Sequence, residues 1–407
     1  LLFPLLFHFG TAFKFLAYSP QFAVSHVNYI GKISDALVEA GHEVVIVAPF
    51  VDPGISGART KKAKVIELPA NEHCLRWNRV QVRAMDLYWD GSYLEIAMDT
   101  DELFDAVAAC HNATWHYPGL IEKIRAEKFD AAFSEDPAGF GLFHLAGISV
   151  HAYTMSFTAF DCNFDITQMP TSPSYVPALL SPYGDQMSFF QRVANTFLSA
   201  AFGFIQKNKR IDLLEPLFDS IQPGLPSLSS VIANTSLVFI NSEPLLDYPR
   251  PTVHRVIDIG GIVTPTEFEP LNQYWSDVLS RRNKTVILSF GTYIKASAMP
   301  EIYKRTFRET LAKFPDVTFI WKYEDPSHNF SGGIENIVET TWLPQVDMLN
   351  DVRLTAFITH GGQGSTLEAA YAGVPMLMVP TQGDQFRNAA MIKRAGLGEV
   401  VYLSAID

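Results

Sequence analysis

The side chains best suited to holding a nucleotide fall within one run of the chain, residues 342–385. Its centre is the glycine-rich turn HGGQGS at 360–365, between an apolar strand expected at 355–359 and a helix expected at 366–372. Such a turn lets the backbone approach a diphosphate, while unpaired N–H groups and the positive end of the helix stabilise its charge. The turn therefore predicts an anion site.

Each part of this run also has an ordinary structural explanation. Ser365 and Glu368 have the spacing of a capping box. Trp342 would suit a half-buried indole, and His360 would suit a strand end with a satisfied ring. The joint spacing favours a binding site, because the candidate side chains fall together: Trp342, Gln345, His360, Ser365, Glu368, Asp384 and Gln385.

At these residues the chain resembles the donor-binding signature of the UDP-dependent glycosyltransferases. This family has the two-domain GT-B fold and includes the UDP-glucuronosyltransferases and plant glucosyltransferases. The resemblance implies that Trp342 packs on the uracil and that Gln345 and Glu368 hydrogen-bond the ribose hydroxyls. The residue types fit, since an indole offers a stacking face and a carboxylate accepts from two vicinal hydroxyls.

The same resemblance implies that the diphosphate is bound by His360, Ser365 and the backbone amides of the turn, which include those of Gly361 and Gly362. An imidazole and several amides can stabilise a leaving phosphate as its charge grows. The residues expected to face the sugar are Asp384 and Gln385.

Gly291-Thr292 ends a strand expected at 285–290 and would add an amide and a hydroxyl to the phosphate site, as in similar family members. A plain tight turn explains these two residues equally well. Two positions depart from the family pattern, because many relatives have histidine at Asp351 and asparagine at Gly364. The second departure leaves the donor open between UDP-glucuronic acid and UDP-glucose.

A second candidate site lies in the first half of the chain, where strands and helices alternate. The strands are expected at 13–18, 43–48, 64–68, 131–134 and 149–155. A helix expected at 27–40 completes the first βαβ unit. This alternation predicts an α/β fold with a doubly wound parallel sheet, in which the first and fourth strands lie side by side at the ligand-binding edge.

His26 follows the first of these strands, and Glu135 and Asp136 follow the fourth. They are predicted to meet in one crevice, where an imidazole and a carboxylate suit a general base with an orienting acid. Ser25-His26 also resembles the family's catalytic histidine segment, and the family's assisting aspartate aligns with Glu135. Strand register decides between the two neighbouring acids, so both stay candidates.

Composition places the chain among globular proteins with room for two domains, since its 407 residues are 48% hydrophobic and 18% charged. A net charge of −12 argues against nucleic acid or an anionic membrane surface as the main partner. Asp99 and Asp101 are explained more simply by a helix start than by a metal motif, and we expect neither a metal nor another cofactor. Three scattered cysteines predict no metal framework but leave one disulfide open: Cys74, Cys110 and Cys162.

The domain boundaries follow from these patterns. Residues 1–12 suit the remnant of a signal peptide, and 13–241 suit an acceptor-binding Rossmann-like domain. A connector rich in proline and glycine is expected at 242–263, followed by a UDP-sugar-binding Rossmann-like domain at 264–407 that lacks its last helices. The resemblance implies that the two domains face a central cleft. The acceptor wall is expected within 153–226.

The helix expected at 188–205 carries Phe189, Val193, Phe197 and Phe204 on one face, which we expect to be core. No run of about 20 apolar residues suits a transmembrane helix. The resemblance implies a protein of the endoplasmic reticulum lumen, held by a C-terminal membrane anchor beyond this chain, with a homo-oligomer possible. Four glycosylation sequons fit that location: Asn112, Asn234, Asn283 and Asn329.

These observations together predict an inverting transfer of a glucuronosyl or glucosyl group from a UDP-sugar to a hydroxyl of a small lipophilic acceptor. Two alternatives stay open. One is a catalytically silent UDP-sugar-binding subunit on the same fold. The other is an epimerase or hydrolase of UDP-sugars.

Overall fold

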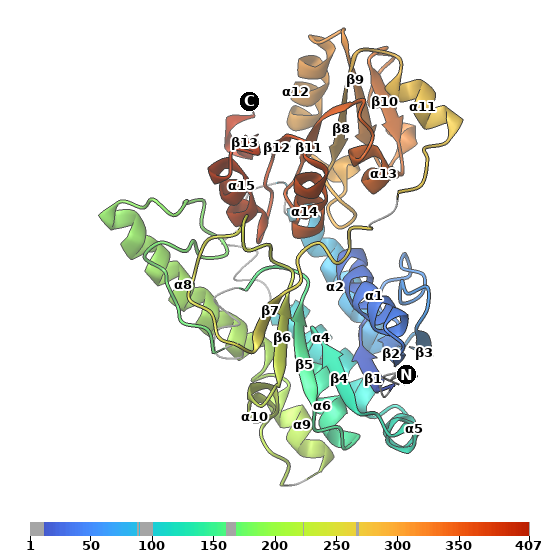
Figure 1. The fold of residues 1–407 in the computed structure, drawn as a ribbon, viewed down its shortest axis with the longest axis vertical. Helices are drawn as coiled ribbons and strands as arrows, with labels where there is room; N and C mark the ends of the chain where they lie inside the picture. Colours follow the sequence, from blue (N-terminus) through green and yellow to red (C-terminus); the bar gives the residue numbers. More distant parts are fainter. Residues whose placement is uncertain are drawn as a thin grey trace, which may run out of the picture.

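Two parallel β-sheets organise the chain (Figure 1). The first has the strand order β3-β2-β1-β4-β5-β6-β7, and the second has the order β10-β9-β8-β11-β12-β13. The order turns back between β1 and β4 and again between β8 and β11, which makes these the two switch points. The prediction of an α/β fold with doubly wound sheets is confirmed. The computed structural model describes residues 12–87, 89, 101–159, 168–222, 224–265 and 268–406.

The first sheet is built from short apolar runs whose two faces enter two different cores. Val45 and Val47 pack in one apolar cluster, while Val44 and Ile46 pack in another, as the alternation of side chains along a strand requires. Its strands are β1 (Lys14–Tyr18), β2 (Glu43–Pro49), β3 (Lys64–Leu68), β4 (Ala131–Ser134), β5 (His151–Met155), β6 (Leu237–Ile240) and β7 (Val256–Asp258). Its helices are α1 (Val24–Glu39), α2 (Glu72–Leu87), α4 (Asp101–Trp115), α5 (Leu120–Glu127), α6 (Pro137–Leu145), α8 (Phe189–Arg210), α9 (Glu215–Ile221) and α10 (Leu228–Ala233).

The second sheet repeats this plan in the last third of the chain. Its strands are β8 (Lys284–Ser289), β9 (Val317–Lys322), β10 (Ile337–Thr340), β11 (Leu354–Thr359), β12 (Met376–Met378) and β13 (Gly398–Val400). Its helices are α11 (Gln273–Leu279), α12 (Glu301–Ala312), α13 (Gln345–Leu349), α14 (Gln363–Ala372) and α15 (Gln385–Arg394). Short 3₁₀ turns occur at Ala296–Ala298, Pro326–His328 and Leu403–Ala405.

The connector predicted at 242–263 is in part a strand. Val256–Asp258 forms β7, which pairs with β6 at the edge of the first sheet. The sequence did not predict so short a strand, because the prolines and glycines around these three residues indicate turns. The first domain therefore extends to Asp258.

The two domains meet through buried polar contacts. Asp247 lies after β6 and pairs with Arg387 of α15, and both side chains are buried. Burial opposes the charge on Asp247, but Arg387 and Arg250 hold its pKa well below the ordinary value. Nearby, Gln363 Nε2 donates to the Asn241 carbonyl oxygen at 2.7 Å. The carboxyl ends of β6 and β11 are thus joined directly.

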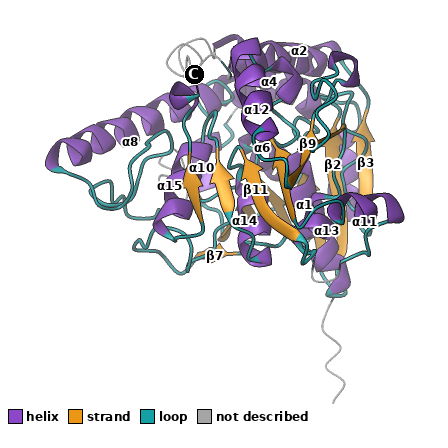
Figure 2. Cartoon of the chain, turned by 90° about the horizontal axis from the view of Figure 1, so that it is seen from above, coloured by secondary structure: helices purple, strands orange, loops and turns teal. Residues whose placement is uncertain are grey.

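The prediction that the apolar face of the helix at 188–205 is core was wrong. Phe189, Val193, Phe197 and Phe204 of α8 are 65%, 54%, 73% and 70% exposed. The inward face instead carries Asn195, which is fully buried and satisfies three backbone groups of the segment 173–178. Figure 2 shows α8 reaching out from the rest of the chain. In the described part of the chain, no helix has the length and apolar character to cross a membrane.

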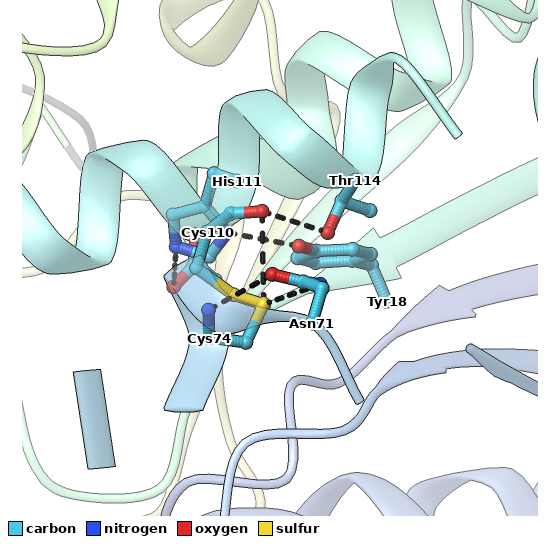
Figure 3. Close-up of a disulfide and its surroundings, with 7 residues drawn as sticks. Tyr18, Asn71, Cys74, Cys110, His111 and Thr114 are labelled. Atoms are coloured by element: carbon cyan, nitrogen blue, oxygen red, sulfur yellow. Dashed lines mark hydrogen bonds and ion pairs between the residues drawn. A yellow bond between two sulfur atoms is a disulfide. The ribbon is translucent and has the colours of Figure 1, made fainter. Parts of the chain in front are cut away.

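A disulfide joins Cys74 of α2 to Cys110 of α4, which answers the possibility that the sequence left open (Figure 3). It closes a loop of 36 residues, a constraint worth about 3–4 kcal/mol in the chain-entropy estimate. It also fixes the part of α4 that carries His111. Cys162, Asp99 and residues 1–11 lie outside the described residues.

Candidate active site

His26 and Glu135 lie at the carboxyl edge of the first sheet. His26 is in the first turn of α1, and Glu135 directly follows β4. Because β1 and β4 are parallel neighbours, the chain leaves both strands at the same edge. There His26 Nδ1 lies 2.7 Å from Glu135 Oε2. The imidazole and the carboxylate meet across the switch point.

The carboxylate of Glu135 is held in place by Ser156, which follows β5. Both the backbone N–H and the hydroxyl of Ser156 donate to Glu135 Oε1 at 2.7 Å. Burial acts to raise the pKa of Glu135, but His26 and these hydrogen bonds hold it below its ordinary value. Glu135 is therefore an oriented anion. With His26 Nδ1 engaged, Nε2 is the nitrogen left to take a proton.

Asp136 turns away from His26. It caps α6 by accepting a hydrogen bond from the Ala138 N–H at 2.8 Å. Its Oδ2 lies 3.2 Å from Nε2 of His111, whose Nδ1 lies 2.9 Å from the Tyr18 hydroxyl. Of the two candidate acids, Glu135 alone contacts the His26 ring.

A cavity of about 250 Å³ opens beside His26. Phe22, Phe104 and Phe157 give it apolar walls, and Glu135 lies at its polar side. Such a mixture suits a small apolar molecule that presents one hydroxyl to the imidazole. Phe157 falls in the predicted acceptor wall, whereas Phe104 of α4 does not.

The predicted nucleotide residues gather at the carboxyl edge of the second sheet. Gln345 Nε2 donates to Ser365 Oγ at 3.0 Å and to Glu368 Oε2 at 2.7 Å. Trp342 is 58% exposed, so part of its indole is open to a ligand. Burial raises the pKa of Glu368 to about 7, against the hydrogen bond from Gln345.

The capping-box alternative for Ser365 and Glu368 was also wrong. Gly362 is the N-cap of α14, so Ser365 lies inside the first turn and its hydroxyl bonds Gln345. The glycines of the turn extend the helix N-terminus by three residues beyond the expected start at Thr366. Ser365 and the free amides of this turn thus face the same edge.

The family model described as "UDP-glucoronosyl and UDP-glucosyl transferase" matches residues 15–406. The chain belongs to this family. It is a UDP-glycosyltransferase, as the signature at 342–385 predicted.

Similar proteins agree with this assignment. The Caenorhabditis elegans proteins ugt-48 and ugt-55, named among the UDP-glucuronosyltransferases, are 28% and 29% identical over 95% and 97% of this chain and 75% and 78% of their own length. Rat UDP-glucuronosyltransferase 1A5 is 27% identical over 88% of this chain and 67% of its own length.

Solved structures show the fold. Os79 from O. sativa, solved with U2F and trichothecene, superposes with a TM-score of 0.62 at 17% identity, over 95% of this chain and 86% of that one. A Phytolacca americana protein solved with UDP-2-fluoro-glucose and pterostilbene gives a TM-score of 0.59 at 16% identity, over 95% and 85%. The transferase therefore has the GT-B fold.

In this transferase, His360 is packed tightly between two glycines. A β-carbon at Gly291 or Gly362 would lie 2.7 Å from the imidazole, and Gly291 also has a φ of +80°. Thr292, next in the same turn, is exposed. Burial and the nearby Lys322 lower the pKa of His360 to about 4, so the imidazole is neutral at pH 7.

Lys322, which no sequence pattern indicated, ends β9 beside this turn. Its ammonium donates to the Gly291 carbonyl oxygen and lies 3.7 Å from Glu324. Burial lowers the pKa of Lys322. A lone lysine in a strand carries no motif, so only the sheet order could reveal a cation at this edge.

Asp384 and Gln385 begin α15 at the same edge. Gln385 Oε1 accepts hydrogen bonds from the Thr381 N–H and hydroxyl, both at 2.8 Å. The side-chain oxygen of Gln385 thus holds the loop that precedes α15. Burial raises the pKa of Asp384 to about 6, with Asn388 and the charge of His26 opposing this. Among the described residues, no group of three or more His, Cys, Asp or Glu side chains could hold a metal ion.

Proposed function

We propose that this transferase moves a glucuronosyl or glucosyl group from a UDP-sugar to a hydroxyl of a small lipophilic acceptor, with inversion at the anomeric carbon. The observation that carries the proposal is the 2.7 Å contact between His26 Nδ1 and Glu135 Oε2 beside an apolar cavity. A catalytically silent subunit would have no need of this arrangement.

The reaction is a single displacement. His26 Nε2 takes the proton of the acceptor hydroxyl as its oxygen bonds to the anomeric carbon, and the bond from that carbon to the UDP oxygen breaks. Glu135 stabilises the imidazolium that forms, because its carboxylate faces Nδ1. One displacement on the face opposite the leaving group inverts the configuration.

The departing diphosphate gains charge at the edge of the second sheet. The amides at the N-terminus of α14, the neutral His360 and the cationic Lys322 would stabilise it. Trp342 would stack on the uracil, and Gln345 and Glu368 would bind the ribose. The residues proposed to face the sugar are Asp384 and Gln385.

The proposal also includes a cellular compartment. A disulfide such as Cys74–Cys110 persists in an oxidising compartment, which fits the lumen of the endoplasmic reticulum. Membrane association would come from a C-terminal anchor. Neither a metal nor another cofactor takes part in the proposed steps.

UDP release tests this function directly. The protein and its His26→Ala variant are given UDP-glucuronic acid or UDP-glucose, each with and without a simple phenol. A His254→Ala variant, at an exposed histidine, is the control. Release that needs both one donor and the phenol supports the transferase. Release without the phenol indicates a hydrolase or epimerase. UDP binding without turnover of any donor indicates a silent subunit.

A further inference from the structure

A row of polar residues runs along the carboxyl edge of the first sheet, from His26 to the second domain. Glu135 follows β4, Ser156 follows β5 and Asn241 follows β6. These three strands are parallel neighbours, so the residues that follow them lie side by side. The row therefore provides a continuous physical route by which the second domain can act on His26.

Asn241 fixes the backbone on both sides of Ser156. Its side-chain Nδ2 donates to the Ser156 carbonyl oxygen at 2.8 Å. Its backbone N–H donates to the Met155 carbonyl oxygen at 3.0 Å and to that of Phe157 at 3.3 Å. Asn241 is buried, where the low dielectric strengthens such bonds. The orientation of the Ser156 peptide therefore depends on Asn241.

Ser156 carries this constraint to the proposed catalytic pair, His26 and Glu135. Its N–H and hydroxyl donate to Glu135 Oε1, and its Oγ also lies 3.1 Å from His26 Nδ1. With the hydroxyl proton directed at Glu135, Oγ can accept from the Nδ1–H of His26. Glu135 Oε2 and Ser156 Oγ then both favour the tautomer that leaves Nε2 free to take a proton. A displaced Ser156 would misalign the pair.

Gln363 connects the row to the glycine-rich turn of the second domain. It is the first residue of α14, the helix at the boundary between the two sheets (Figure 1). Its side chain is buried, and Nε2 donates to the Asn241 carbonyl oxygen at 2.7 Å. Its neighbours Gly362 and Ser365 belong to the proposed diphosphate site. A shift of this turn relative to the first sheet would therefore act on Asn241.

We propose that Gln363 and Asn241 are positioning residues that couple the donor-binding turn to the alignment of His26. This inference rests on the proposed transferase function. Both residues act through Ser156 and Glu135 rather than on the substrates. The base is aligned while the glycine-rich turn is seated against the end of β6, so that the donor site and the base are in place together.

Tyr371 provides a matched control on the same helix. Its hydroxyl donates to Glu243 Oε2 at 2.8 Å and to the Gly260 carbonyl oxygen at 3.1 Å, so it too joins α14 to the chain that follows β6. Neither of these partners belongs to the row. Tyr371→Phe therefore removes a contact between the domains and leaves the row intact.

Initial rates of UDP release and calorimetry with UDP form the first test. Gln363→Leu, which keeps the size of the side chain, should lower kcat about tenfold, because a misplaced base slows the reaction. Its UDP affinity should be unchanged. Asn241→Ala should give the same result, and adding it to Glu135→Gln should lower kcat further by less than about twofold, because both changes act through one carboxylate. Tyr371→Phe should keep the full rate.

Two kinetic results would contradict the proposal. A loss of UDP affinity at unchanged kcat in Gln363→Leu would make Gln363 a donor-binding residue instead. Equal falls in kcat for Gln363→Leu and Tyr371→Phe would mean that any contact between the domains has the same effect.

Nuclear magnetic resonance of protein with isotope-labelled histidine tests the alignment without turnover. The Nδ1–H signal of His26, identified by its loss in His26→Ala, should shift or broaden in Gln363→Leu and in Asn241→Ala. It should stay in place in Tyr371→Phe. An unchanged signal in Gln363→Leu or Asn241→Ala, in a sample that binds UDP, overturns the proposal. A shifted signal in a protein that transfers no sugar would overturn the proposed function alone.

Discussion

Glu135 and Asp136 are consecutive residues whose carboxylates pair with histidines of two different helices. Glu135 Oε2 lies 2.7 Å from His26 of α1, and Asp136 Oδ2 lies 3.2 Å from His111 of α4. The two acids that follow β4 therefore have different partners, His26 for Glu135 and His111 for Asp136. If His26 is the base, only the first acid should govern the rate of transfer.

Glu135→Gln should lower kcat for every acceptor by about 100-fold, because the imidazolium loses its carboxylate. The KM for the acceptor should change little. Initial rates of UDP release measure both constants. Glu72→Gln, at a glutamate whose side chain is 76% exposed, is the control and should keep the full rate. An unchanged kcat in Glu135→Gln would remove the carboxylate from the mechanism.

Glu368 should make the free protein less stable as the pH rises. Its pKa of about 7 in the folded chain lies above the ordinary 4.5, so the folded state holds a proton that the unfolded state has lost between these values. Stability therefore falls as the pH rises through that window. Glu368→Gln should escape this loss, and its Tm relative to the unaltered protein should increase from pH 5 to pH 8. A difference in Tm that does not depend on pH would contradict the burial of this carboxyl.

Gly362→Ala should weaken UDP binding and lower the free energy of unfolding by about 1–3 kcal/mol, because the new methyl group would press on the His360 ring. Gly364→Ala is the matched control in the same turn, since a β-carbon there meets nothing within 4 Å. Calorimetry with UDP and thermal unfolding give the two readouts. Equal effects of the two substitutions would mean that His360 moves aside at no cost.

Lys322→Met should weaken UDP about tenfold and leave uridine unaffected, because only the diphosphate needs the cation. Lys322→Arg should retain most of the affinity for UDP. Lys313→Met, at the exposed C-cap of α12, controls for the loss of one positive charge. If Lys322→Met lost the same affinity for uridine as for UDP, the role of Lys322 would be limited to stabilising the Gly291 turn.

The strands and their order were accessible from the sequence. Apolar runs separated by helices predict parallel strands, and β3 and β4 have the predicted bounds, Lys64–Leu68 and Ala131–Ser134. The switch point between β1 and β4 then places His26 near the end of β4, and this inference needs only the order of the strands. The residue pattern alone left the choice between the two acids open, because neighbouring residues at a strand end point in different directions, and only the family resemblance pointed to Glu135.

Other features depend on packing that no local pattern records. The apolar stripe of α8 is as regular as that of a core helix, yet Phe197 is 73% exposed, and the face that packs on the chain is the one that carries Asn195. Ser156 and Lys322 are single polar residues at strand ends. Only the assembled sheets show that these two side chains lie against Glu135 and Gly291.

The central claim is that His26 removes the proton of the acceptor. Its most direct test is the rate of sugar transfer by His26→Ala, with UDP affinity measured on the same sample. We predict a fall in kcat of about 1,000-fold, unchanged UDP affinity and, in the unaltered protein, a product of inverted anomeric configuration. Transfer by His26→Ala at the rate of the unaltered protein would contradict the mechanism.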